Sequence, residues 1–144
     1  MKKLILPILA VALLCGCANL PPGTALSRAI AGMNATLPYV VAVVTENDSS
    51  TVKDFGAAAA VIDKLAGGTN TTPAQLLAAV KALGLNKNAE LAIVGGVAVW
   101  QLYVSQYPTS TTADAQLFLT ALAADLRAGI VTPAKALKAK LPRK

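Results

Sequence analysis

The chain has only two cysteines, Cys15 and Cys17, and they are the residues whose chemistry is easiest to define. Both follow an apolar stretch at 4–14, and the next 127 residues contain no further cysteine. A cysteine thiolate can act as a nucleophile, bind a metal ion or form a disulfide. Histidine is absent from the whole sequence, which removes the commonest nucleophile–base pairs and the softer metal-ligand sets.

The N-terminus has the layout of a bacterial secretory signal. Lys2 and Lys3 form a short positive head, residues 4–14 (LILPILAVALL) form an uncharged apolar run, and the small residues at 15–18 follow. An apolar run of this length is too short to span a bilayer permanently. We therefore expect export from the cytoplasm and removal of this segment.

The stretch at 14–17, LCGC, resembles the lipobox of bacterial lipoprotein precursors, in which an aliphatic residue and two small residues precede an obligatory cysteine. The resemblance implies that Cys17 receives a diacylglycerol thioether, that the signal is cut off before it, and that the new amino terminus is acylated. Cys15 stands where Ala or Ser is more usual and would leave with the signal. Ala18, rather than Asp, implies sorting to the outer membrane, although Gram-positive lipoproteins carry a similar box.

A second interpretation of the same residues remains open. Gly16-Cys17-Ala18 also has the small-x-small pattern of an ordinary signal-peptidase site, with cleavage after Ala18. That cleavage would release a soluble secreted or periplasmic protein, whereas lipidation of Cys17 would anchor the chain through its acyl chains.

Charge is unevenly distributed along the chain, whose net charge is +6. The segment at 132–144 holds five basic residues: Lys135, Lys138, Lys140, Arg143 and Lys144. Between the signal and this tail lie six basic and seven acidic side chains, so the body is nearly neutral. Nucleic-acid binding requires a basic folded face, so we expect no nucleic-acid partner. The tail is either a solvated terminus or a contact with an anionic lipid surface.

Composition and spacing predict an all-α fold. Alanine, the best helix former, supplies about a fifth of the residues, and aromatic residues only 4%. We expect a bundle of about five to six short helices at 24–131, after a signal peptide at 1–16 and a lipidated tether at 17–23, with the basic tail at 132–144. Three threonines with a polar residue three positions later have the spacing of a helix-capping box: Thr51 with Asp54, Thr72 with Gln75, and Thr111 with Asp114.

Other signals set the expected ends of helices. Gly67, Gly84 and Gly129 follow periodic apolar stretches and are expected to end helices there. A helix from about Thr24 is expected to be kinked or broken at Pro38. A short helix is expected to begin at Thr132-Pro133, with its lysines opposite a small apolar edge.

The uncharged segment at 91–104, LAIVGGVAVWQLYV, allows three interpretations. It predicts the central helix of the bundle, with Asn88 as its cap and Pro108 just past its end. It also fits a β-hairpin with a Gly-Gly turn, which would make the fold α+β. The third possibility is a membrane-inserting helix, although 14 residues fall short of the roughly 20 needed to span a bilayer.

Acidic residues offer no clear catalytic or metal site. Those near helix starts satisfy free N–H groups, and Asp63 and Asp125 are expected on the solvated surface. Glu46 and Asp48 lie two apart in a loop, without the full set of oxygen ligands that calcium requires. We therefore expect no enzyme activity, no cofactor and no metal.

Two classes of function remain. The first is a lipid-anchored structural or interaction module with an envelope protein as partner, for which Trp100, Tyr103 and Tyr107 are the largest contact residues, unless they pack in the core. The second is a membrane-acting protein that disturbs a bilayer through the segment at 91–104 and the basic tail, as in phage-related lysis or exclusion.

Overall fold

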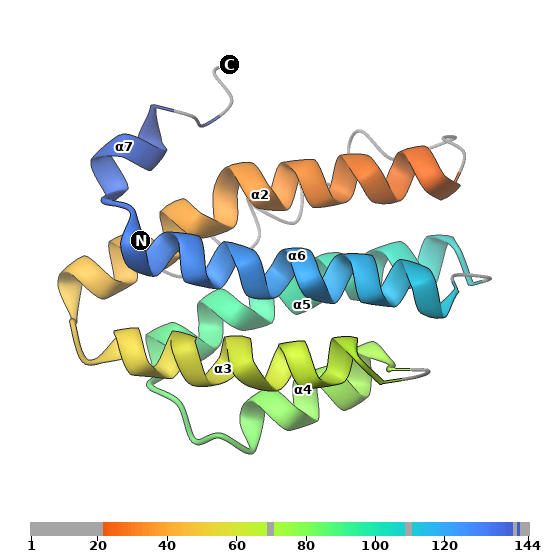
Figure 1. Ribbon diagram of the computed structural model, residues 1–144, viewed down its shortest axis with the longest axis horizontal. Coiled ribbons are helices and arrows are strands. Elements are labelled where there is room, and N and C mark those ends of the chain that lie inside the picture. Colours follow the sequence, from red (N-terminus) through yellow and green to blue (C-terminus); the bar gives the residue numbers. More distant parts are fainter. Residues whose placement is uncertain (1–21, 69–70, 109–110, 140, 142–144) are drawn as a thin grey trace.

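A computed structural model describes residues 22–68, 71–108, 111–139 and 141. These residues form six helices: α2 (Pro22–Asn47), α3 (Thr51–Ala66), α4 (Pro73–Lys81), α5 (Lys87–Gln106), α6 (Thr112–Val131) and α7 (Ala134–Lys138). No strand occurs among the described residues (Figure 1). The prediction of a small all-α bundle is confirmed, and the alternative with a β-hairpin at 91–104 is wrong.

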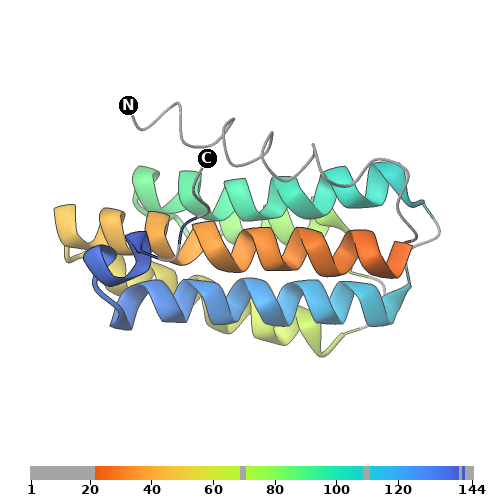
Figure 2. The ribbon, with the colours of Figure 1, turned by 90° about the horizontal axis from the view of Figure 1, so that it is seen from above.

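The four long helices, α2, α3, α5 and α6, run along the length of the molecule (Figures 1 and 2). Helix α6 packs extensively against both α2 and α3, and α5 packs against α2. The short α4 covers α5 and part of α3, and α7 packs on α2. Helices α2, α4 and α6 begin at one end of the bundle, and α5 ends there (Figure 1). We call this the proximal end. Helix α7 lies at the opposite end, which we call the distal end (Figure 1).

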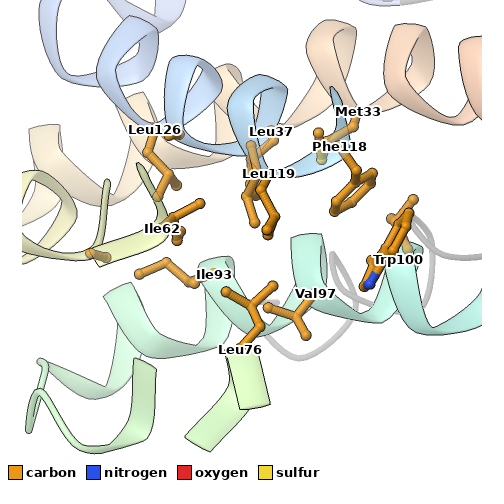
Figure 3. Packing of buried hydrophobic residues seen from close by; sticks show 14 of the residues in the cluster. Met33, Leu37, Ile62, Leu76, Ile93, Val97, Trp100, Phe118, Leu119 and Leu126 are labelled. Carbon is orange, nitrogen blue, oxygen red and sulfur yellow. The ribbon is translucent and has the colours of Figure 1, made fainter. Parts of the chain in front are cut away.

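One continuous apolar core holds these helices together. Its largest fully buried side chains come from all five longer helices and include Met33, Phe55, Leu76, Ile93 and Phe118. Figure 3 shows Ile62 of α3 between Leu126 of α6 and Ile93 of α5. Full burial of such a side chain stabilises the fold by about 1.5–3 kcal/mol, so this core is the main source of stability.

Two of the three predicted capping boxes are present. The Thr72 hydroxyl accepts a hydrogen bond from the Gln75 backbone N–H at 3.2 Å, and the Gln75 side chain accepts from the Thr72 N–H at 3.0 Å. Thr111 and Asp114 make the same pair of bonds, at 3.2 and 3.0 Å. Each box satisfies two of the donors that a helix N-terminus leaves free, so α4 and α6 begin where the spacing predicts.

The prediction of a third capping box, at the start of α3, is wrong. Ser50 is the N-cap residue and makes no side-chain cap, while Thr51 lies inside the helix and donates to the Asp48 carbonyl at 2.7 Å. Asp54 instead accepts from the backbone N–H of Asn86, 32 positions along the chain, at 3.1 Å. The capping role that was predicted for Asn88 belongs to Asn86, whose side chain accepts from the Asn88 N–H at 2.9 Å.

Helix α2 continues through Pro38. A proline inside a helix removes one backbone hydrogen bond and costs about 3 kcal/mol, which normally breaks the helix. Here Leu37 and Val41, on either side of the proline, are both fully buried in the core. Their packing holds both halves of α2 in one helix despite this cost.

Gly129 does not end α6, which runs on to Val131. A methyl group at Gly129 would lie 2.6 Å from the Pro38 carbonyl oxygen and would overlap Val41. The glycine therefore allows the backbones of α6 and α2 to approach closely, which is a packing role rather than a terminating one. The predicted stop at Gly67 is confirmed, and Gly84 adopts a φ of +63° after α4 has ended.

The segment at 91–104 lies within α5, and Pro108 falls just past the end of this helix. Its buried residues include Ile93, Val97 and Trp100. A Cβ at Gly96 would meet the Leu122 side chain of α6 at 2.6 Å, so this glycine leaves room for Leu122 between α5 and α6. Tertiary packing thus selects the helix over the turn that the Gly-Gly pair allows.

Candidate functional site

The predicted lipid attachment residue, Cys17, lies outside the described residues, as does Cys15. The described chain begins with α2 at Pro22, five residues after Cys17, at the proximal end of the bundle (Figure 1). Cys17, at which the sequence predicts lipidation, is therefore five positions along the chain from this end.

The aromatic residues proposed as contact residues form a stacked row near the proximal end. The ring of Trp100 lies 5.1 Å from Phe118 and 5.6 Å from Tyr103, and Tyr103 lies 5.0 Å from Tyr107. Trp100 and Tyr103 are buried and Tyr107 is half-buried. Trp100 and Tyr103 therefore pack in the core, which leaves little of either ring for a partner protein.

A half-open pocket with a volume of about 200 Å³ lies beside this aromatic row. The first residues of α4 and α6 form two of its sides, and the C-terminal part of α5 forms a third. None of its described lining residues is charged. They are Thr71, Thr72, Pro73, Trp100, Val104, Thr111, Thr112 and Ala115.

The polar groups around the pocket are set by the two capping boxes. The hydroxyl oxygens of Thr72 and Thr111 accept backbone N–H groups, so the hydrogen of each hydroxyl remains able to donate. Asp114 accepts from the N–H of Thr111 and brings a negative charge near this end. Burial, and to a smaller extent the charge of Asp114, raises the pKa of Tyr103. Two hydroxyl groups that can donate thus line the pocket, and one carboxylate lies near it.

Asp125 contradicts the expectation of a solvated surface position. It is only 6% exposed, and burial raises its pKa to about 7. With its amide oriented to donate, the side chain of Asn34 on α2 lies 2.8 and 2.9 Å from the two carboxylate oxygens. These bonds favour the ionised form and so oppose the rise in pKa. Asp125 shares a helix face with Leu122 and Gly129, a signal of burial that the sequence contained.

Three further acidic residues have structural partners. Asp63 of α3 pairs with Arg127 of α6 on the surface, and Glu46 accepts from the backbone N–H of Ala134 at 2.9 Å. Asp48 accepts from the Ser50 backbone N–H at 3.0 Å. Among the residues that the structure describes, no group of three or more histidine, cysteine or acidic side chains has the arrangement of a metal site.

One described helix, α2, is long and apolar enough to cross a membrane by length and composition alone. Its Met33, Leu37 and Val41 are fully buried against the other helices. A buried core helix of a bundle meets the same two criteria, so this property does not distinguish a core helix from a membrane span.

Comparison of the chain with protein-family models, curated proteins and solved structures found no match in any of the three.

Proposed function

We propose that the protein is a bacterial lipoprotein in which acyl chains on Cys17 hold the helical bundle at a membrane, and that the bundle is a structural or interaction module without catalytic activity. The observation that carries the proposal is LCGC at 14–17, followed by Ala18. Each buried methylene of an acyl chain contributes about 0.8 kcal/mol, so two or more chains anchor stably. Ala18 favours the outer membrane, and an envelope protein is the proposed partner.

The position of α2 supports a short tether. Four residues separate Cys17 from Pro22, and the five steps between these two residues span at most about 18 Å when the chain is fully extended. A lipid on Cys17 would therefore keep the proximal end close to the bilayer. The 26 residues of α2 rise about 39 Å, so the distal end stands well clear of the bilayer when the bundle is upright.

The basic tail supports a second, weaker membrane contact only in one orientation. Leu137 and Ala134 of α7 are buried against α2, which leaves Lys135 and Lys138 exposed at the distal end. These lysines reach an anionic lipid surface if the bundle lies along the bilayer. Each positive charge near such a surface would then contribute about 1 kcal/mol to binding. Binding to anionic vesicles that weakens at high salt would be its signature.

A matched pair of cysteine replacements tests the anchor. Cells that express the protein are fed a clickable fatty acid, and the label on the purified chain is measured. We expect label on the original chain and on Cys15→Ser, and a mislocalised, unlabelled precursor for Cys17→Ser, because only Cys17 follows the pattern of the lipobox. A processed chain without label would favour cleavage after Ala18 and a soluble protein.

The alternative function is a membrane-acting protein, and the helix that favours it is α2, whose length and composition suit a membrane span. The segment at 91–104, the earlier basis of this alternative, contributes Ile93, Val97 and Trp100 to the core. Insertion of either helix would expose the rest of the core to water, which opposes it. Dye release from liposomes by the folded protein would favour the alternative over the interaction module.

A further inference from the structure

One residue that lines the pocket at the proximal end, Trp100, carries a side-chain donor without an acceptor in the described part of the chain. Trp100 is only 3% exposed, yet its indole N–H donates to no acceptor in the described part of the chain. No side-chain nitrogen or oxygen of the described residues is both sealed from solvent and unpaired. The indole nitrogen is therefore accessible to solvent, and Trp100 is one of the residues that line the pocket.

The orientation of the indole agrees with this conclusion. Trp100 stacks on Phe118 at 5.1 Å, and Figure 3 shows its nitrogen on the edge of the ring that points away from Phe118. Stacking fixes the ring, so the N–H direction is set before any ligand arrives. A buried indole N–H usually finds a hydrogen-bond partner, and a preorganised donor without one is suited to an acceptor atom on a ligand.

The walls of the pocket define the rest of the ligand. Thr72 and Thr111 offer two further donors, while Pro73, Val104 and Ala115 are apolar. This combination suits a ring with an oxygen acceptor at one edge. The volume of about 200 Å³ is slightly larger than the roughly 150 Å³ of a cavity that accepts benzene.

The charges near the pocket limit the class of ligand that it can bind. The described lining residues include no lysine or arginine that could neutralise an anion, and Asp114 lies immediately before the lining residue Ala115. The Asp114 carboxylate accepts from the backbone N–H of the lining residue Thr111, so it adds a negative charge near the pocket that disfavours an anionic ligand. We propose that the pocket binds an uncharged, single-ring molecule whose carbonyl oxygen accepts the indole N–H of Trp100. This inference does not depend on lipidation of Cys17.

The single tryptophan of the chain provides a direct measurement. The full chain, labelled with ¹⁵N and held in detergent micelles, is titrated with δ-valerolactam, a neutral ring with one carbonyl. We expect a saturable downfield shift of the one indole N–H signal and a matching change in tryptophan fluorescence, with a dissociation constant on the order of 1 mM for so small a ligand. No saturable change in either signal would overturn the proposal.

Two variants with the same substitution separate the pocket from the surface. Ala115→Leu fills the pocket and should weaken binding by at least about tenfold. Ala124→Leu adds the same group at an exposed position of the same helix and should leave binding unchanged. Equal binding by both variants would place the ligand elsewhere and overturn the proposal.

Two further titrations keep the proposal testable if Ala115→Leu does not fold. Trp100→Phe keeps a ring in the core and removes the indole donor, and saturation-transfer signals from the lactam should fall about tenfold. Unchanged signals would refute the role of the indole. Cyclopentanecarboxylate, an anion of similar size, should cause no comparable shift of the indole signal in the original chain. Tighter binding of this anion than of the lactam would refute the proposal that the ligand is uncharged.

Discussion

Helix α6 packs most extensively on α2 and α3, and its contacts with these two helices are built in different ways. On the side of α2, Gly129 lets the two backbones approach closely, and Asp125 is buried next to Asn34. On the side of α3, apolar side chains such as Leu126 and Ile62 pack together, and Asp63 pairs with Arg127 at the surface (Figure 3). Both contacts are extensive.

The difference shows that residue type alone does not decide what a residue contributes. Asp125 and Asp63 are both aspartates on long helices, yet only Asp125 is buried. Gly129 and Gly56 both lie inside long helices, yet a methyl group at Gly56 would meet nothing within 4 Å. Matched replacements at these pairs of positions therefore measure what the α2–α6 contact adds.

The largest difference in the free energy of unfolding is expected between alanine replacements at Gly129 and Gly56. Gly129→Ala should lower the free energy of unfolding by about 3 kcal/mol, because the added methyl group meets the rigid Pro38 carbonyl. Gly56→Ala should raise it by about 0.5–1 kcal/mol, because an open helix position gains helix propensity. Urea denaturation followed by circular dichroism measures both. Similar effects at the two glycines would mean that α2 and α6 adjust to the extra group.

The second-largest effect on the free energy of unfolding is expected at the buried carboxyl of Asp125, and it should depend on pH. Burial raises the pKa of Asp125 from 3.8 to about 7, so the folded state binds more protons than the unfolded state between these values. Stability from this residue is therefore present below about pH 4 and lost as the pH rises to about 7. Asn34 opposes the shift, so we expect a loss on the order of 2 kcal/mol.

Asp125→Asn isolates this effect because its amide carries no charge at any pH in the range. The variant should be more stable than the original chain at pH 8, and the advantage should disappear near pH 4. Denaturation curves at several pH values measure the difference. An advantage that does not change with pH would show that the Asp125 carboxyl is not destabilised by burial in the folded protein.

The smallest effect is expected at the surface ion pair on the α3 side. Asp63→Ala and Arg127→Ala should each lower the free energy of unfolding by less than about 1 kcal/mol, because both side chains are about half exposed and solvent screens the pair. The double variant should lose no more than the larger of the two single losses. A loss above 2 kcal/mol that persists in high salt would mean that the α3–α6 contact also depends on charge.

Short-range features of the fold were predictable from the sequence. The capping boxes at Thr72 and Thr111 and the helix end at Gly67 depend on hydrogen bonds between residues no more than four positions apart, so spacing alone reveals them. The start of α3 was not predictable in this way. Asp54 binds Asn86, a partner that only the folded chain brings near.

The sequence by itself determined that the described chain is helical, where two of its helices begin, and which cysteine has the pattern of a lipid attachment site. Tertiary structure decided that Gly129 packs rather than ends a helix, that Asp125 is buried, and that Trp100 lines a pocket with an unpaired N–H. The physical reason is distance along the chain. Gly129 and Asp125 meet residues of α2 about 90 positions away, and burial depends on which helices pack together.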